Sequence, residues 1–114
     1  MSRIYKILAR EAWEAARTAG CFEGAGVDLA DGYIHFSTAA QAGETARRYF
    51  TDQTDLVVLE VEADDLGAKL KWEPSRGGDL FPHLYGPLPC ELVRVARAAP
   101  LDAEGAPMLG DLAP

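Results

Sequence analysis

The segment from Trp72 to Pro89, WEPSRGGDLFPHLYGPLP, concentrates side chains that could do chemistry. It contains three large aromatic rings and two groups suited to proton transfer: Trp72, Phe81, Tyr85, Glu73 and His83. Its prolines and glycines disfavour a regular helix or a central strand and predict a rigid, irregular loop. A long loop with this content is typical of a pocket wall, on which Trp72, Phe81 and Tyr85 would stack against a flat ligand.

The second histidine lies in DGYIHFST, which predicts a short strand from Tyr33 to Ser37. Because side chains alternate along a strand, Tyr33, His35 and Ser37 share one face, whereas Ile34 and Phe36 take the other. One face is therefore apolar and suited to the core. The opposite face presents a phenol, an imidazole and a hydroxyl in a row, as expected of a ligand-facing surface.

The end of this strand is also the expected start of a helix, with Ser37 or Thr38 as its cap. Backbone N–H groups at a helix N-terminus favour anions, so we expect a phosphate or carboxylate beside Ser37 and Thr38. The alternative is that these hydroxyls only cap the helix.

The candidate chemistry rests on two imidazoles that are distant in sequence but face one cavity. His35 and His83 would act as polar anchors or proton carriers, and Glu73 would orient an attacking group or act as a base, with Asp79 as the weaker carboxylate. The histidines have no HxH or HxxxH spacing, so we expect no metal site. Each residue also has a structural interpretation, as a stiff turn packed on the core or as a half-buried, hydrogen-bonded side chain.

Composition restricts the classes of partner. The chain has 114 residues and a formal net charge of −7, which disfavours a protein that binds nucleic acid generally through phosphate contacts. No apolar run is long enough to span a bilayer, and we expect a cytoplasmic protein with no membrane partner. Cys21 and Cys90 are isolated, so we expect reduced, partly buried thiols.

The elements that must position these residues form one α+β domain over residues 1–98, followed by a C-terminal surface tail over residues 99–114. We expect strands at 3–8, 33–37, 56–61, 70–72 and 91–98, and helices at 9–19 and from Ser37 or Thr38 to Phe50. The run 56–61 (LVVLEV) is typical of a central strand covered on both faces. Residues 21–32 are expected to form a loop.

Several motifs together resemble the small bacterial proteins grouped as domain of unknown function 952. These motifs are IYKIL with Trp13, DGYIHFSTAAQ, LVVLEV followed by DDLG, and KWEPSRGGDLFPHLYGPL, and together they cover about residues 3–98. That resemblance implies a family but no activity.

The segments IHFSTAAQAGETARRYF and LVVLEVEADDL are also similar to RNA 2′-phosphotransferases of the ADP-ribosyltransferase superfamily. This similarity implies a split, mixed sheet with two main helices and with His35 and Ser37 facing a nucleotide cleft. The departure is in the first strand, where the superfamily carries a His-Gly-Thr or Arg motif. Here that strand reads IYKIL, which offers only Tyr5 and Lys6 as polar candidates.

The leading expectation is a small pocket protein that binds, and if catalytic processes, a nucleotide-type or phosphorylated ligand. No resident cofactor is required, and NAD would enter as a substrate of an ADP-ribosyl-type transferase. The alternatives are a ligand sensor or accessory domain without turnover, and a protein-interaction domain that uses the 72–89 loop as a docking surface.

Overall fold

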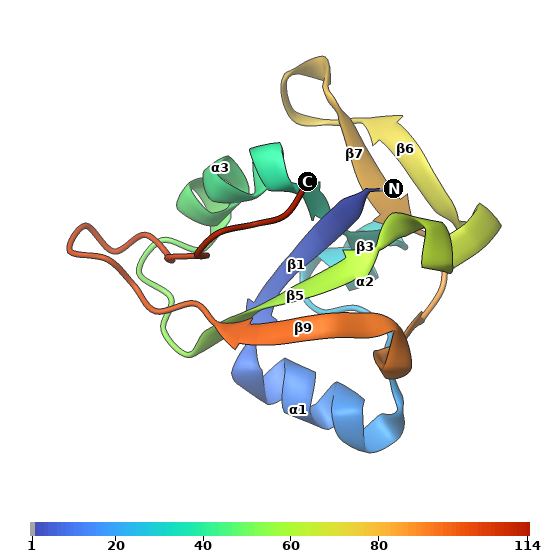
Figure 1. Cartoon of the computed structure of the whole chain (residues 1–114), viewed down its shortest axis with the longest axis horizontal. Helices are drawn as coiled ribbons and strands as arrows, with labels where there is room; N and C mark the ends of the chain where they lie inside the picture. Colours follow the sequence, from blue (N-terminus) through green and yellow to red (C-terminus); the bar gives the residue numbers. More distant parts are fainter. Residues whose placement is uncertain (1) are drawn as a thin grey trace.

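Two antiparallel sheets form the framework of the protein. The computed structural model describes residues 2–114, apart from the side chain of Arg76, so residue 1 of the expected domain lies outside the described residues. The larger sheet has the order β4-β1-β5-β9 and consists of Ser37–Thr38, Arg3–Ala9, Leu56–Glu62 and Val93–Ala98. The smaller sheet has the order β3-β7-β6 and consists of Ile34–His35, Leu80–Leu84 and Leu70–Pro74 (Figure 1).

Strands β2 (Cys21–Phe22) and β8 (Leu88–Pro89) form a separate two-stranded sheet. All pairings between described strands are antiparallel, so the expected mixed sheet is wrong. Short 3-10 helices occupy Ala63–Lys69, Arg76–Gly78 and Cys90–Leu92. The predicted α+β class is confirmed.

Two main helices cover opposite faces of the larger sheet. Helix α1 (Arg10–Ala19) buries Trp13 and Ala16 and ends at Gly20, whose φ of 94° is accessible to glycine. Helix α3 (Ala39–Tyr49) starts at a capping box in which Thr38 and Gln41 satisfy each other's backbone N–H. The alternating side chains of β1 therefore enter two separate cores, one beneath each helix.

Strand β5 is buried at every position, as its continuous apolar run predicted. Its two neighbours, β1 and β9, pair with it along most of their lengths. The strand therefore forms the centre of the larger sheet, and β1 lies beside it with β4 on its other edge.

The segment 72–89 is not an irregular loop, and this expectation was wrong. Strands β6 and β7 form a regular hairpin, and β7 is the central strand of the smaller sheet although it contains Pro82. The proline is tolerated because its C=O accepts from Phe36 N at the point where the neighbouring chain leaves the sheet. Pro82 has no N–H to donate back to Phe36, and at a position where the neighbouring strand ends this missing bond is tolerated.

The expected strand from Tyr33 to Ser37 is divided between the two sheets. Ile34 and His35 form β3 and pair with β7, whereas Ser37 and Thr38 form β4 and pair with β1. Phe36 lies between them and is buried in the core. The segment 21–32, expected to be a loop, contains β2 and the short helix α2 (Val27–Asp31).

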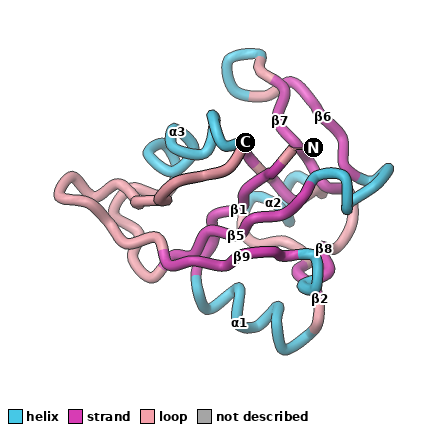
Figure 2. The backbone as a smooth tube through the Cα atoms, viewed as in Figure 1, coloured by secondary structure: helices cyan, strands magenta, loops and turns pink. Residues whose placement is uncertain are grey.

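The segment 99–114 runs beside α3 as a loop that follows the surface (Figure 2). It contributes side chains to the core beneath α3, where Ala99 is buried and Leu109 and Leu112 pack partly buried. Tyr5 Oη donates to Ala113 O over 2.5 Å. Among the described residues, no helix is long and apolar enough to cross a membrane.

Candidate functional site

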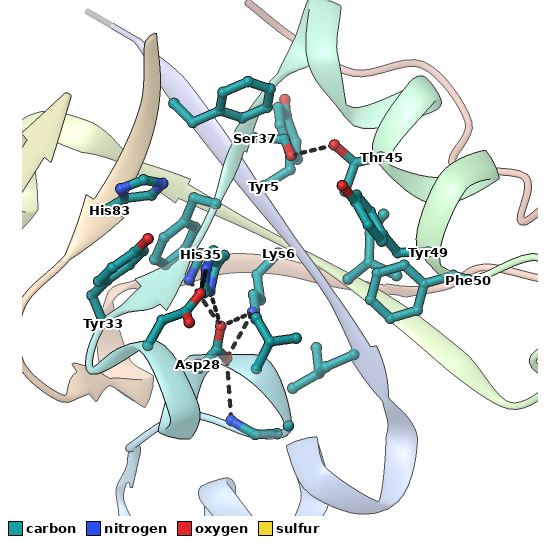
Figure 3. Close-up of a pocket in the computed structure, with 18 of the residues that line it drawn as sticks. Tyr5, Lys6, Asp28, Tyr33, His35, Ser37, Thr45, Tyr49, Phe50 and His83 are labelled. Atoms are coloured by element: carbon teal, nitrogen blue, oxygen red, sulfur yellow. Dashed lines mark hydrogen bonds and ion pairs between the residues drawn. The ribbon is translucent and has the colours of Figure 1, made fainter. Parts of the chain in front are cut away.

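A cavity of about 570 Å³ opens where the two sheets separate. Its polar side carries residues from β1, α2, β3 and β7, and its apolar side carries residues from β1, α1 and α3 (Figure 3). The polar side includes Lys6, Asp28, Asp31, Tyr33, His35, Ser37 and His83. The volume falls in the range of pockets that take small organic ligands.

The two histidines, distant in sequence, lie opposite each other in this wall. His35 on β3 and His83 on β7 are direct register partners, and their ring centroids are 5.5 Å apart. Tyr33 joins them, stacked on His83 with a centroid distance of 4.2 Å and tilted against His35 at 4.6 Å. The structure therefore brings together the two imidazoles and the phenol that the sequence placed on one surface.

Asp28 is the buried centre of the polar wall, and the sequence analysis did not identify it. Its carboxylate accepts from Lys6 Nζ at 2.8 Å, from His35 N at 3.0 Å and from Ala25 N at 3.1 Å. His35 Nδ1 lies 2.6 Å from Asp28 Oδ1, and His35 Nε2 lies 2.9 Å from Asp31 Oδ2. Figure 3 shows Asp28 between His35 and Lys6. Asp28 thus holds the imidazole, a strand backbone and a buried ammonium in one network.

The charges of this network depend on one another. Burial raises the pKa of Asp28, but the hydrogen bonds from His35 and the charge of Lys6 outweigh burial and lower this pKa to about 2. Burial lowers the pKa of Lys6, and the Asp28 carboxylate offsets part of that effect. Because the Lys6 ammonium is paired with the Asp28 carboxylate, Lys6 does not supply an unpaired positive charge to the cavity.

His83 is oriented from behind by a second carboxylate. His83 Nδ1 lies 2.8 Å from Glu73 Oε1, and Tyr85 Oη donates to the same oxygen over 2.7 Å. Glu73 is not among the residues that line the cavity. Its carboxylate can therefore fix the tautomer of His83, with Nδ1–H toward Glu73 and Nε2 toward the cavity, while contacting no ligand itself.

Tyr85 should stay protonated to unusually high pH. The hydrogen bond to Glu73 raises the pKa of Tyr85 to about 12, because ionisation would place a phenolate against a carboxylate. We expect the Tyr85 ring signal in an NMR titration to remain unchanged through the pH range in which an ordinary tyrosine ionises. In a Glu73→Gln variant the transition should move down toward the reference value of 10.0. An unshifted transition in both proteins would contradict the contact.

The predicted anion site at Ser37 and Thr38 has its hydroxyls engaged within the protein. Thr38 Oγ1 accepts from Gln41 N as the helix cap and does not line the cavity. Ser37 does line the cavity, and its Oγ lies 3.0 Å from Thr45 Oγ1.

The remaining predicted residues separate into those inside and those outside the cavity. Phe81 lines it, whereas Trp72, Tyr85 and Asp79 do not. Trp72 is 41% exposed on β6, and Tyr85 lies 5.1 Å from Tyr33 by ring centroids. The structure thus brings together Tyr33, His35, Ser37, Phe81 and His83. Glu73 and Tyr85 lie behind them.

The described residues contain no cluster of three or more His, Cys, Asp or Glu that could hold a metal ion. Cys21 and Cys90 are both half-buried free thiols outside the cavity wall.

Comparison with known proteins identifies the family. Residues 7–96 match the model of the family described as "Protein of unknown function (DUF952)". The crystal structure of protein CC0527 from Caulobacter crescentus is 55% identical to this chain, covers 96% of each chain and has a TM-score of 0.94. The solution NMR structure of CC0527 is 56% identical, covers 97% of this chain and 96% of that chain, and has a TM-score of 0.87. No curated protein matches. The chain therefore belongs to the DUF952 family.

Proposed function

We propose that this protein binds a nucleotide-type small molecule in the cavity between its two sheets. The observation that carries the proposal is the pairing of His35 and His83 across β3 and β7, with both rings lining one cavity. Two adjacent imidazoles that face a small-molecule-sized space are unusual in a wall whose only function is packing. The same cavity is lined by Asp28 and Lys6, whose pKa values are both lowered, and shifted pKa values in a concave site are typical of binding and catalytic sites.

The composition of the cavity supports a ligand with a flat ring and a polar group. Tyr49, Phe50 and Phe81 supply apolar and aromatic surface, and His35, His83 and Tyr33 supply donors and acceptors. Such a division between apolar walls and a few convergent polar groups orients a ligand. Lys6, which lines the cavity, is already paired with Asp28, so it would not neutralise a ligand phosphate.

The histidines suit proton transfer in different ways. With its Nδ1–H directed to Glu73, His83 presents Nε2 to the cavity as an acceptor, and no described residue bonds that nitrogen. We propose that an enzymatic version of the site would activate a nucleophile through His83, for attack at the ribose C1′ of NAD. An ADP-ribosyltransferase-like arrangement is supported by the separation of the two sheets at Phe36, beside the cavity.

A sensor without turnover is favoured by a different observation. Both ring nitrogens of His35 lie within 3.0 Å of carboxylate oxygens, on Asp28 and Asp31. Donation to both requires both nitrogens to carry hydrogen, so this imidazole is not a base in this state. A ligand that displaced the Asp31 carboxylate would accept a hydrogen bond from His35 Nε2–H. Such a contact would bind the ligand without catalysing a reaction.

A thermal-shift experiment tests the proposal. NAD, ADP-ribose and nucleoside monophosphates are added singly, and a ligand at about 100 times its Kd should contribute about 2.7 kcal/mol and raise Tm by a few degrees. The shift should shrink in His35→Gln and His83→Gln but persist in Arg48→Gln, whose side chain is exposed on α3. Absence of a shift with every compound would overturn the nucleotide proposal.

A second assay separates enzyme from sensor once binding is established. The protein is incubated with NAD, alone and with candidate acceptors, and free nicotinamide is measured. Release that His83→Gln abolishes would support the transferase. Binding without release would support the sensor.

A further inference from the structure

Strand β1 is paired along the whole of one edge, whereas its other edge is paired only near its start and is open to the cavity beyond that point. In an antiparallel ladder, hydrogen-bonded and non-hydrogen-bonded pairs alternate, so the backbone groups of successive residues point to opposite sides. Ala63 N donates to Ser2 O at one end of the β1–β5 ladder, and Arg10 N donates to Asp55 O at the other. Both pairs fit the β1–β5 register. Even-numbered residues of β1 therefore bond to β5, whereas odd-numbered residues face the other side.

On that other side, the neighbouring strand stops early. Strand β4 pairs only with Ile4 and Tyr5. Continued in the same register, the chain would place His35 opposite Ile7, but His35 pairs with His83 in the smaller sheet instead. The separation of the two sheets thus leaves the edge of β1 uncovered from Ile7 onward.

Three backbone groups are left on this edge: the N–H and C=O of Ile7 and the N–H of Ala9. None has a hydrogen-bond partner within residues 2–114. The C=O of Ala9 differs, because Ala9 is the N-cap of α1 and its carbonyl starts the helix. The cavity is bounded by five consecutive residues, Tyr5 to Ala9, and four of them, Lys6, Ile7, Leu8 and Ala9, lie beyond or beside the end of the β4 pairing. Since consecutive side chains point to opposite faces, a space that touches all four lies at the edge of the strand.

We propose that the open edge of β1 recognises ligands that present a hydrogen-bond donor and an acceptor side by side. A ring lactam, a primary carboxamide and one extended amino-acid residue all do so, and each can pair with both groups of Ile7. A carboxylate cannot, because one of its oxygens would face the Ile7 carbonyl. The inference rests on the proposed function only in placing a small ligand in this cavity, and it does not require a nucleotide.

The surroundings of this edge strengthen the recognition. Ala12, Val27, Tyr49 and Phe50 flank it within the cavity and offer apolar surface. Unpaired backbone groups in such surroundings cost free energy, and a ligand that pairs with them removes that cost. The edge also lies in the same cavity as His35, so one ligand can contact both.

Amide hydrogen exchange of the free protein tests the open edge before any ligand is added. We expect the N–H groups of Ile7 and Ala9 to exchange about 100-fold faster than those of Lys6 and Leu8, which bond to β5. Equal protection of Ile7 and Leu8 would overturn the inference. This result is independent of whether nucleotides bind.

Matched probes then test whether the edge binds a paired donor and acceptor, and whether a ring lactam or an extended peptide residue supplies that pair. 2-Pyridone represents a ring lactam and is compared with 2-methoxypyridine, which lacks the N–H. Acetyl-alanine methylamide represents an extended residue and is compared with its doubly N-methylated analogue. We expect one amide or both, added to isotope-labelled protein, to shift the Ile7 and Ala9 amide signals while the blocked analogues do not. Shifts with neither amide, or equal shifts with a blocked analogue, would overturn the proposal.

The chain also offers a backbone control. The Gly20–Cys21 junction suits chemical ligation of a synthetic N-terminal peptide to the rest of the chain. An ester in place of the Ile7 N–H also weakens the Lys6 carbonyl as an acceptor in the β1–β5 ladder, but it should lower Tm less than an ester at Leu8 does. It should weaken amide binding at least about tenfold, because one ligand bond is lost. The same ester at Leu8 should lower Tm, because it removes a ladder bond. Equal loss of Tm at both positions would overturn the assignment of the free N–H.

Discussion

Replacing Asp28 with asparagine is expected to lower the free energy of unfolding by about 3–5 kcal/mol, because removing one partner of a buried ion pair leaves the other charge uncompensated. The Asp28 side chain is 2% exposed, and its partner Lys6 is 10% exposed. The same change also weakens the bonds to His35 N and Ala25 N. Urea unfolding of the purified variant measures the loss.

Two further variants show whether the ion pair is the cause. Asp31→Asn removes the other carboxylate bound to His35, but the Asp31 side chain is 45% exposed, so we expect a change of less than about 1 kcal/mol. Adding Lys6→Met to Asp28→Asn removes the uncompensated ammonium and should restore about 1–3 kcal/mol. If Asp28→Asn and Asp31→Asn are equally mild, the buried network does not stabilise the fold.

The effect of Asp28 should depend on pH in a defined direction. The pKa of Asp28 in the folded protein, about 2, lies below the ordinary value of 3.8, so the contribution of Asp28 to stability is complete above about pH 4 and is lost as the pH falls through about 2. This lowering of the Asp28 pKa corresponds to about 2 kcal/mol of folding stability. The gap in stability between the wild type and Asp28→Asn should therefore narrow in acid.

Truncating the chain after Pro107 is expected to lower the free energy of unfolding by about 2–4 kcal/mol. The removed segment carries Leu109 and Leu112, which pack partly buried against the core beneath α3, and Ala113, whose carbonyl accepts from buried Tyr5. Loss of two leucine contacts and one hydrogen bond accounts for this magnitude. Chemical denaturation of the truncated chain measures it.

The matched point variants separate packing from chain length. Leu112→Ser should account for a large part of the loss, whereas Met108→Ser should change stability by less than about 0.5 kcal/mol, because Met108 is 48% exposed. A truncated chain as stable as the full-length protein would show that 108–114 is only a surface tail.

Local patterns predicted the elements that carry their own periodicity. Helix α1, helix α3 and the central strand β5 follow from apolar spacing, caps and a continuous β-branched run. The alternation placed Tyr33, His35 and Ser37 on one face, and all three line the cavity, but Phe36 from the opposite face lines it as well. These patterns depend on residues that are close in sequence, and the tertiary contacts of the folded protein favour the same elements.

Features that depend on distant pairing could not be predicted from the sequence. Strand β7 contains Pro82, and only its pairing with β6 and the departure of Phe36 make a proline acceptable there. Asp28 lies in a segment of turn residues, and its role depends on Lys6, which is 22 positions away in sequence. A carboxylate in a polar loop carries no signal that it will be buried.

NMR of the two imidazole rings tests the central claim most directly, because His35 and His83 are the only histidines in the chain. The two sets of ring signals can be assigned with His35→Gln and His83→Gln, and then followed as ADP-ribose and NAD are added. We predict that a bound ligand shifts both rings with the same saturation curve. A ligand that stabilises the protein but leaves both rings unchanged would contradict a site between them.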